Sequence, residues 1–535
     1  MNETKQRVAE LWDQTGGNVS EISRLIGVSR STVNHHMRTL GLDKDSKPLS
    51  GGKAKADKAV QANKPKRGAV KRYLLTSLQN NTVINDTVWS NLMALKAHYK
   101  AEVHVARFTY NKNSYGRLSV KPGTASAPDS DLWYDPSCES YFSDDDVELA
   151  PGLVWCGRQN TLPTAQNPLG GFESYHGRKS TIIPHVRIDL KSIPSGKFES
   201  PKLMFSTGTV GKLNYIQKRM GIKAEHHHSY GALLVEVNDK GQWWCRQLHA
   251  DGKGRLFDLD VIADGGKVRS GKRAHVESIT WGDIHLEDID PVMRKLAWST
   301  GGILDTLKPN SQVLGDLVDP PRSYHNMKDP HLMFEQYVTG RESMGDMCDR
   351  IVNFVNEESF RRWCTTIVAN SNHDNMVDKW LREADYRLDP VNALFFLEAQ
   401  LAKYEAIAAG DKRFLTVENA MRIRGCREEI RWLREDESVI ICKDRKGGIE
   451  IGAHGHLGPN GARGSAANLS KMSRRMNRGH SHTADITAGV YTAGTSSKLD
   501  LGYNRGPSSW SHSFVVTYTN GKRQIITVYD GKWRA

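Results

Sequence analysis

AHVESITWGDIH, residues Ala274–His285, decides how the second half of this 535-residue chain is expected to fold. Its apolar and β-branched beginning is typical of a buried strand, and the stretch ends in Asp283 and His285. Aspartate and histidine are common metal ligands. A strand that ends in such residues presents them at the carboxyl edge of a sheet, where ligands bind. We therefore expect a β-sheet in this half, with a candidate metal site along one edge.

Four further strand-like segments end in residues of the same kind. Asp-x-His, Gly-Asp and Asn-His-Asp each occur by chance in many chains, whereas their order along this chain is specific. The groups in chain order are Asp283 and His285; Asp316; Asn372, His373 and Asp374; His454 and His456; and His480 and His482.

The chemistry of a two-metal site explains why these residue types are needed together. Two divalent ions about 3.5–4 Å apart require one carboxylate that bridges them, together with mixed nitrogen and oxygen ligands. Asp316 is the natural bridge, because it is an acid that follows Gly315, and the glycine lets the backbone approach closely. If two ions bind at this edge, Asp316 is the residue expected between them.

The five groups in this order resemble the motifs of the calcineurin-like metallophosphoesterases, which include the SbcD-type DNA nucleases. The resemblance covers residues 283–482. It implies a two-sheet α/β sandwich, flanked by helices, with two metals on its loop edge. It also implies that Asp283, His285 and His482 complete the first metal, and that Asn372, His454 and His480 complete the second.

The resemblance further implies a catalytic role for His373, as a general acid or charge stabiliser at the leaving-group oxygen, with Asp374 orienting it. The mixed ligand set suits manganese, with zinc, iron or magnesium as alternatives. The chain departs from the family at Ser371, where a glycine is usual. In the His-Gly-His segment the family pattern favours His454 as the ligand, with His456 as the alternative.

KMSRRMNR, residues 471–478, places four cations just before the last two histidines. One interpretation is a solvated basic loop. The alternative is a clamp that follows the phosphates of a DNA backbone beside the metals. The cations are Lys471, Arg474, Arg475 and Arg478, and we predict DNA contacts for the three arginines.

Residues 1–42 have the pattern of a helix–turn–helix and resemble small bacterial and phage DNA-binding modules. Ile22, Leu25 and Ile26 share one helical face, Gly27 provides the turn, and a second helix follows. A helical hairpin for protein contacts is the alternative. For the DNA-binding interpretation, the outward side chains at the start of the second helix are Arg30, Ser31, Thr32, Asn34 and His35.

Residues 43–72 lack apolar periodicity and are predicted to be a flexible linker. Residues 44–72 hold ten basic and two acidic side chains, so they carry eight of the formal +13 charges. Such a run is either a solvated tether or a source of phosphate affinity through counterion release.

Residues 73–270 begin with a strand, an amphipathic helix and a second strand, which predicts a β–α–β unit and a parallel sheet. Short strands dominate from about residue 180, and neither a phosphate-binding loop nor a G-x-G-x-x-G motif is present. His226–His228 fit a polar strand edge or, as an alternative, a metal site. We therefore expect an α/β middle domain of unknown role, followed by a metallophosphoesterase domain over residues 271–535.

The overall composition is that of a soluble α/β protein, with 38% hydrophobic and 25% charged residues. No apolar run approaches the length of a membrane span, and the first residues lack the apolar core of a signal peptide. The seven cysteines form no C-x-x-C pair, which favours a reducing cytoplasm.

The order of these segments resembles the large DNA-transfer proteins of tailed bacteriophages, which are tied to degradation of host DNA. We therefore expect a two-metal-dependent DNA nuclease that acts on DNA in the bacterial cytoplasm. The alternatives are a phosphatase or small-nucleotide phosphodiesterase, and a DNA-binding regulator with a degenerate phosphoesterase domain. The sequence leaves the oligomeric state open and allows a homo-oligomer.

Overall fold

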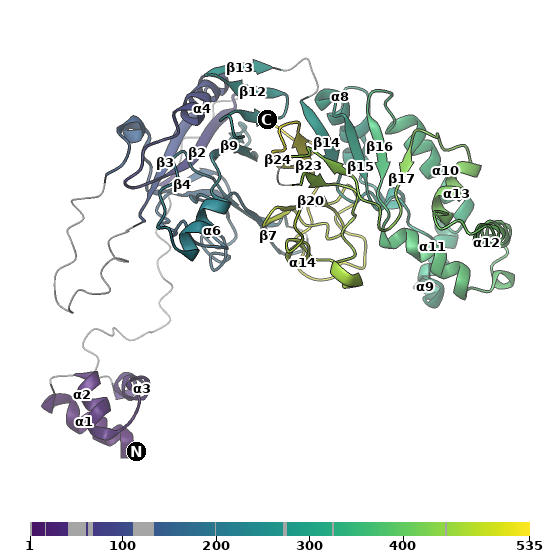
Figure 1. The fold of residues 1–535 in the computed structure, drawn as a ribbon. Helices are drawn as coiled ribbons and strands as arrows, with labels where there is room; N and C mark the ends of the chain where they lie inside the picture. Colours follow the sequence, from purple (N-terminus) through teal and green to yellow (C-terminus); the bar gives the residue numbers. More distant parts are fainter. Residues whose placement is uncertain are drawn as a thin grey trace. The chain divides into compact units, whose positions relative to one another are not determined.

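The computed structural model describes residues 3–15, 18–40, 60–61, 68–110, 133–197, 199–270, 275–323, 326–444 and 447–535. They belong to two compact units, residues 1–58 and 59–535. The fold is mixed α/β, with several sheets and with helices in both units (Figure 1). Among the described residues, no helix combines the length and the apolar character that a membrane crossing needs.

The first unit contains helices α1 (Glu3–Gln14), α2 (Val19–Ile26) and α3 (Arg30–Leu40). Asn18 caps α2 and Gly27 ends it with a φ of 66°, so a short turn leads into α3. Val8, Ile22, Val33 and Met37 form the buried core. Leu25, which we expected on the buried face, is 52% exposed, because the stripe of α2 that meets the other helices is centred on Ile22 and Ile26.

The predicted linker, residues 43–72, lies outside the described residues apart from 60–61 and 68–72. Within it, β1 (Val60–Gln61) pairs with β4 (Asp146–Ala150), and β2 (Lys71–Gln79) begins before the predicted boundary at residue 73.

A four-stranded sheet contains the predicted β–α–β unit. β2 and β3 (Glu102–Phe108) are parallel and are joined by α4 (Asp86–Tyr99), which confirms that prediction. β9 (Gly231–Val237) and β10 (Trp243–His249) complete the sheet in the order β10-β9-β2-β3, and both pair antiparallel, so the sheet is mixed and not parallel as predicted. A small sheet of β11 (Leu256–Asp258), β12 (Val261–Asp264) and β13 (Lys267–Ser270) lies against α4.

An eleven-stranded sheet crosses the predicted boundary at residue 270. Its order is β1-β4-β5-β6-β8-β7-β21-β22-β20-β19-β18, so strands before residue 210 and strands after residue 439 share one hydrogen-bonded array. Residues on both sides of the predicted boundary therefore belong to one sheet and pack together. The remaining bounds are β5 Leu153–Cys156, β6 Ser180–Ile183, β7 Leu190–Ile193, β8 Lys202–Ser206, β18 Ile440–Ile441, β19 Ile449–Glu450, β20 Arg475–Arg478, β21 Asp485–Thr487 and β22 Val490–Thr492.

A six-stranded sheet carries the segment with which the sequence analysis began. Its order is β17-β16-β15-β14-β23-β24, in which β14 to β17 are parallel and β23 and β24 form an antiparallel hairpin. The hairpin turns at Gly521, as the Asn-Gly pair predicts. The bounds are β14 Val276–Thr280, β15 Ser311–Leu314, β16 Thr365–Val368, β17 Arg431–Trp432, β23 Ser513–Tyr518 and β24 Arg523–Thr527.

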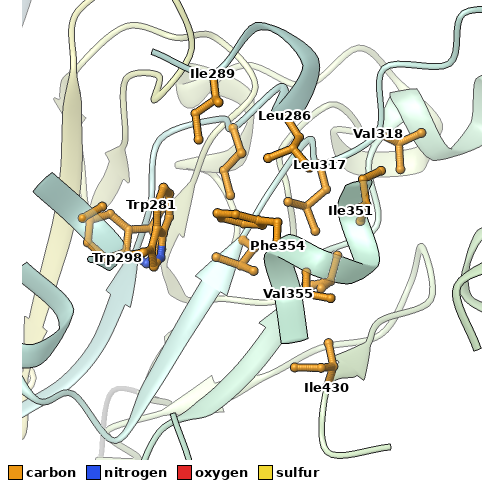
Figure 2. Close-up of a cluster of buried hydrophobic side chains, with 14 of the residues drawn as sticks. Trp281, Leu286, Ile289, Trp298, Leu317, Val318, Ile351, Phe354, Val355 and Ile430 are labelled. Carbon is orange, nitrogen blue, oxygen red and sulfur yellow. The ribbon is translucent and has the colours of Figure 1, made fainter. Parts of the chain in front are cut away.

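Helices cover one face of this sheet, and the eleven-stranded sheet packs on the other. On the helical face, Trp281, Trp298 and Phe354 lie in the largest core (Figure 2). On the opposite face, Val313 and Ile367 meet Ile449, which lies in β19. The helices are α7 Pro291–Trp298, α8 Ile303–Leu307, α10 Met344–Asn353, α11 Asn372–Glu383, α12 Ala393–Ala408 and α13 Thr416–Ile423. Helix α9 (Pro330–Thr339) has no buried residue, and α6 (Arg219–His227) and α14 (Ala466–Leu469) lie elsewhere in the unit.

Candidate metal centre

The predicted metal ligands converge because the strands that carry them end at one edge. β14, β15 and β16 are parallel, and they lead directly into the Asp-x-His, Gly-Asp and Asn-His-Asp segments. β19 and β20 are parallel in the facing sheet, and the His454 and His480–His482 segments follow them. The five segments therefore meet at one edge of the two packed sheets.

A first cluster joins Asp283, His285, Asp316 and His482, all of them buried, with their ligand atoms within 4.8 Å of one another. The Nε2 atom of His482 lies 3.2 Å from an Asp283 carboxylate oxygen. It also lies 3.0 Å from Nε2 of His285, which is 3.7 Å from an Asp316 oxygen. The nitrogens and oxygens therefore point toward a common centre. This is the ligand set that the family resemblance implies for the first metal.

A second cluster joins Asp316, His454 and His480 within the same 4.8 Å limit. Nε2 of His454 lies 3.2 Å from an Asp316 oxygen, and the rings of His454 and His480 are 5.3 Å apart. Asp316 belongs to both clusters, which is the position expected of a bridging carboxylate. Asn372 begins α11 at the same edge.

Several buried ligand atoms at this edge accept no hydrogen bond from the described residues. Burying a carboxylate without a partner is costly, and a bound cation removes that cost. The residues present therefore fit divalent metal ions, and the mixed nitrogen and oxygen set is one that manganese, zinc and iron accept. The unpartnered atoms include both oxygens of Asp283, one oxygen of Asp316 and Oδ1 of Asn372.

The charges of the two clusters are mutually stabilising. Burial raises the pKa of the Asp316 carboxyl, but the neighbouring His454 and His373 outweigh burial and hold that pKa well below its usual value. Asp283 likewise has a lowered pKa because His454 and His482 offset its burial. Both carboxylates are thus ionised, as a metal ligand must be.

The backbone at the ligands is strained. His285, Asp316, His480 and His482 all have positive φ, between 45° and 69°, which is uncommon for residues with a side chain. Gly479 shows how closely the loops approach, because a Cβ at this position would lie 2.0 Å from an Asp283 oxygen. The surrounding packing, and not local preference, therefore sets the direction of these side chains.

His373 is held by a residue that the sequence analysis missed. Its Nδ1 lies 3.0 Å from the Val318 carbonyl oxygen and 3.3 Å from Oδ1 of Asp319. The same Asp319 oxygen lies 2.8 Å from Nδ1 of His285. Burial lowers the pKa of His373, but Asp316 and Asp319 outweigh burial and raise it to about 10. The spacing Gly-Asp-x-x-Asp in GDLVD was the available signal for Asp319.

Asp374 does not contact the His373 ring in the way we expected. Its carboxylate accepts a hydrogen bond from the Ser371 N–H at 2.8 Å and, with Ser371, forms the capping box that starts α11. Burial raises the pKa of Asp374 to about 7. The orienting position predicted for Asp374 is taken by Asp319, and Ser371 replaces the usual glycine because it is the helix cap.

His456 lies outside both clusters. Its ring centroid is 5.6 Å from that of His454 and 6.2 Å from that of His480. Its nearest acidic partner is Glu435, at 3.9 Å. Of the two histidines in the His-Gly-His segment, the structure therefore brings His454 into the site.

The three arginines of the predicted phosphate clamp differ in their surroundings. Arg478 is buried and donates hydrogen bonds to the Gly455 carbonyl at 3.0 Å and to Ser481 Oγ at 3.3 Å. It therefore supports the loops that carry the histidines and is not available to a phosphate. Arg475 pairs with Asp444 at 2.7 Å, and Arg474 is partly exposed.

The predicted DNA-reading residues lie at the start of α3. Arg30 is exposed, and Thr32 shares a hydrogen bond of 2.8 Å with Ser29. The side chains of Ser31, Asn34 and His35 lie outside the described part of the chain.

A second group of metal-ligand types lies far from this edge in the sequence. Asp146, Cys156 and His176 bring their ligand atoms within 4.8 Å. Asp146, however, already receives hydrogen bonds from Tyr175 at 2.5 Å, from His176 at 2.9 Å and from the Arg158 N–H at 3.3 Å. The three consecutive histidines, His226–His228, end α6 and do not lie at a strand edge.

Most of this chain is similar to a bacteriophage protein. No protein-family model matches this chain, and no solved structure matches it. Protein A1 of Escherichia phage T5 is 35% identical over 478 residues, which cover 87% of this chain and 83% of that protein. At this identity and coverage, the chain belongs to the family of Protein A1 of Escherichia phage T5.

Proposed function

We propose that this phage-family protein is a two-metal-dependent nuclease that hydrolyses phosphodiesters of DNA. The observation that carries the proposal is the pair of buried clusters that share Asp316, with carboxylate oxygens that accept no hydrogen bond from the described residues. The fold proposed for this part is the two-sheet sandwich of the calcineurin-like metallophosphoesterases.

Two divalent cations in such clusters supply Lewis acidity toward the phosphate and lower the pKa of a bound water. We propose two manganese ions, with zinc, iron or magnesium as alternatives. One cation would be held by Asp283, His285 and His482. The other would be held by Asn372, His454 and His480. Asp316 would contact both cations.

His373 has the properties of the proton donor in this proposal. Both partners of its Nδ1, the Val318 carbonyl oxygen at 3.0 Å and Asp319 at 3.3 Å, favour a protonated imidazole. Val318 and Asp319 engage Nδ1, so Nε2 is the atom left to face the substrate. As the bond between phosphorus and the leaving oxygen breaks, a proton from Nε2 neutralises that oxygen. Asp319 keeps the ring in place and is a positioning residue.

DNA is the proposed substrate because of the first unit and the charge beside it. The turn between α2 and α3 and the exposed Arg30 fit a helix–turn–helix that contacts DNA. Ten basic residues in residues 44–72 add sequence-independent affinity for phosphates. A small phosphorylated substrate would need neither feature. Host DNA in the bacterial cytoplasm is the proposed target.

The test is hydrolysis of plasmid and linear DNA with and without manganese. We expect cleavage by the wild type only with metal, and none by Asp316→Ala or His480→Ala. Asp146→Asn is the matched control, because it alters a buried carboxylate of the other cluster and should leave cleavage intact.

Two outcomes would contradict the proposal. Hydrolysis of a small phosphodiester without cleavage of DNA would identify a phosphatase or small-nucleotide phosphodiesterase. A gel shift with DNA but no hydrolysis of either substrate would identify a DNA-binding regulator with a degenerate site.

A further inference from the structure

Two aromatic side chains stand beside the candidate metal centre, on the segment between β22 and β23. Trp510 packs edge-on against the His482 ring, with centroids 4.1 Å apart. Tyr503 packs against Trp510 at 5.8 Å. Tyr503 is nevertheless 62% exposed, so one ring is fixed between a metal ligand and a second ring that opens to solvent.

The segment is anchored at several points, so the two rings are held in place. Ser508 and Ser195 exchange two backbone hydrogen bonds, of 2.9 and 3.0 Å. The Ser511 N–H donates to the His482 carbonyl oxygen at 3.2 Å. Asn504 closes the turn around Tyr503 by donating to the Leu499 carbonyl oxygen at 2.9 Å. A surface built this way offers little conformational freedom to lose on binding.

The Tyr503 side chain, with its hydroxyl, is linked to the metal centre through Trp510, which packs on both Tyr503 and His482. Partial burial raises the pKa of this hydroxyl, and the carboxylates of Asp319, Asp316 and Asp283 raise it further. Much of the surface of Tyr503 stays open to solvent. Arg505, two residues further on, is exposed.

We propose that Tyr503 and Trp510 form a stacking shelf for an unpaired nucleobase of the nucleotide next to the phosphate at the metal centre. The inference rests on the proposed function, since it needs a nucleic acid at that centre. Stacking on an aromatic ring is open to every base and does not depend on sequence.

A purely structural role, in which the two aromatic rings only hold His482 in place, would not explain why Tyr503 is present and exposed. Trp510 packs edge-on against the His482 ring, and Tyr503 packs on Trp510. An exposed tyrosine beside a buried charged site is better explained if a planar ring of a bound partner stacks on it. The consequence is a preference for single-stranded or frayed DNA, because a paired base in intact duplex cannot reach the shelf.

Binding is tested with single-stranded oligonucleotides that carry 2-aminopurine, in the His373→Asn background so that the probe is not consumed. We expect quenching of the fluorophore at one position along the oligonucleotide. Tyr503→Ala should abolish this quenching and weaken binding about 10-fold, the scale of one stacked base. Tyr503→Phe, which keeps the ring, should restore both.

Tyr404→Ala is the matched control, because Tyr404 on α12 is 66% exposed and plays no part in the proposal. It should bind and quench as the parent does. Manganese titration and thermal unfolding of every variant should match the parent, which excludes loss of the metal centre or of the fold as the cause.

A substrate with one abasic position completes the test. Removing the base next to the cleaved bond should raise KM about 10-fold for the wild type and have no further effect in Tyr503→Ala. An equal rise in KM for both proteins, or equal quenching by Tyr503→Ala and the parent, would overturn the proposed stacking shelf. The proposed DNA cleavage would not be affected by that result. Quenching that depends on Tyr503 without any DNA cleavage would instead overturn the proposed function and keep the shelf.

Discussion

Two regions of the described chain bring together residues of metal-binding type, the edge around Asp316 and the group of Asp146, Cys156 and His176, and they differ in what their buried carboxylates already do. At the edge shared by β14, β15, β19 and β20, both oxygens of Asp283 accept no hydrogen bond from the described residues. In the other cluster, Asp146 receives hydrogen bonds from Tyr175, His176 and the Arg158 N–H. Distance between ligand atoms does not separate the two clusters, because both satisfy the same 4.8 Å limit.

We expect an unpartnered buried carboxylate to be a stronger sign of a metal site than closeness of ligand types. A carboxylate with its hydrogen bonds in place needs no cation, and a metal would have to displace those partners. Burial raises the pKa of the Cys156 thiol far above its ordinary value, so the thiolate that a metal requires is disfavoured there. We therefore assign a structural role to the Asp146 cluster.

The largest effect is expected from Asp316→Asn, because this residue belongs to both ligand groups. The variant should lose manganese binding and DNA hydrolysis together, and manganese should no longer raise its unfolding temperature. Isothermal titration and thermal unfolding with and without metal measure this. Retention of two tightly bound ions by the variant would show that Asp316 is not a shared ligand.

His373→Asn should lower kcat for DNA about 10²–10⁴-fold, the usual contribution of a general acid, and leave manganese binding intact. The separation follows because His373 contacts Asp319 and Val318 and lies in neither ligand group around Asp316. Single-turnover rates measured beside metal titration separate the two effects. Loss of metal in parallel with rate would place His373 among the ligands.

Asp319→Asn should have a smaller effect, about 10–100-fold on rate or metal affinity, as expected of a group that orients a ligand from behind. Its carboxylate serves both His285 and His373, so the two effects should occur together. Asp374→Asn is the comparison. It should weaken the start of α11 and lower thermal stability, with little direct effect on the His373 ring.

Part of this site could be predicted from sequence, because a strand and the residue that ends it are local features. Asp283, Asp316, His454 and His482 each follow a strand-like run, and parallel strands bring such ends together. Asp319 was also within reach, since GDLVD contains it, but its role depends on the direction of two histidine rings.

Other features depend on contacts between distant segments and could not be predicted in the same way. Arg478 was expected at the surface as a phosphate contact, but Gly455 and Thr492 surround it, and they lie in two other segments. The eleven-stranded sheet joins β7 to β21 across almost 300 residues, through the single pair Ile486 and Leu190. No local pattern in either half indicates that pairing.

The Asp146→Asn variant tests whether the Asp146 cluster has only a structural role. It should leave manganese binding and DNA hydrolysis unchanged. It should also lower stability by about 1–3 kcal/mol, because hydrogen bonds to a buried charged group are lost. Thermal unfolding and metal titration of the same sample measure both. A manganese, zinc or iron ion that binds the wild type but not Asp146→Asn would restore this cluster as a metal site.

Removal of residues 1–58 should affect the metal centre least, because neither cluster lies in the first compact unit. Manganese affinity and hydrolysis of a small phosphodiester should match the full chain. DNA binding should weaken, because Arg30 and the cations up to Lys58 are lost. The slope of log affinity against log salt should then fall by roughly 0.9 for every phosphate contact removed on duplex DNA. An unchanged slope would mean that this unit contacts no phosphates, and the protein-binding interpretation of the helical hairpin would take its place.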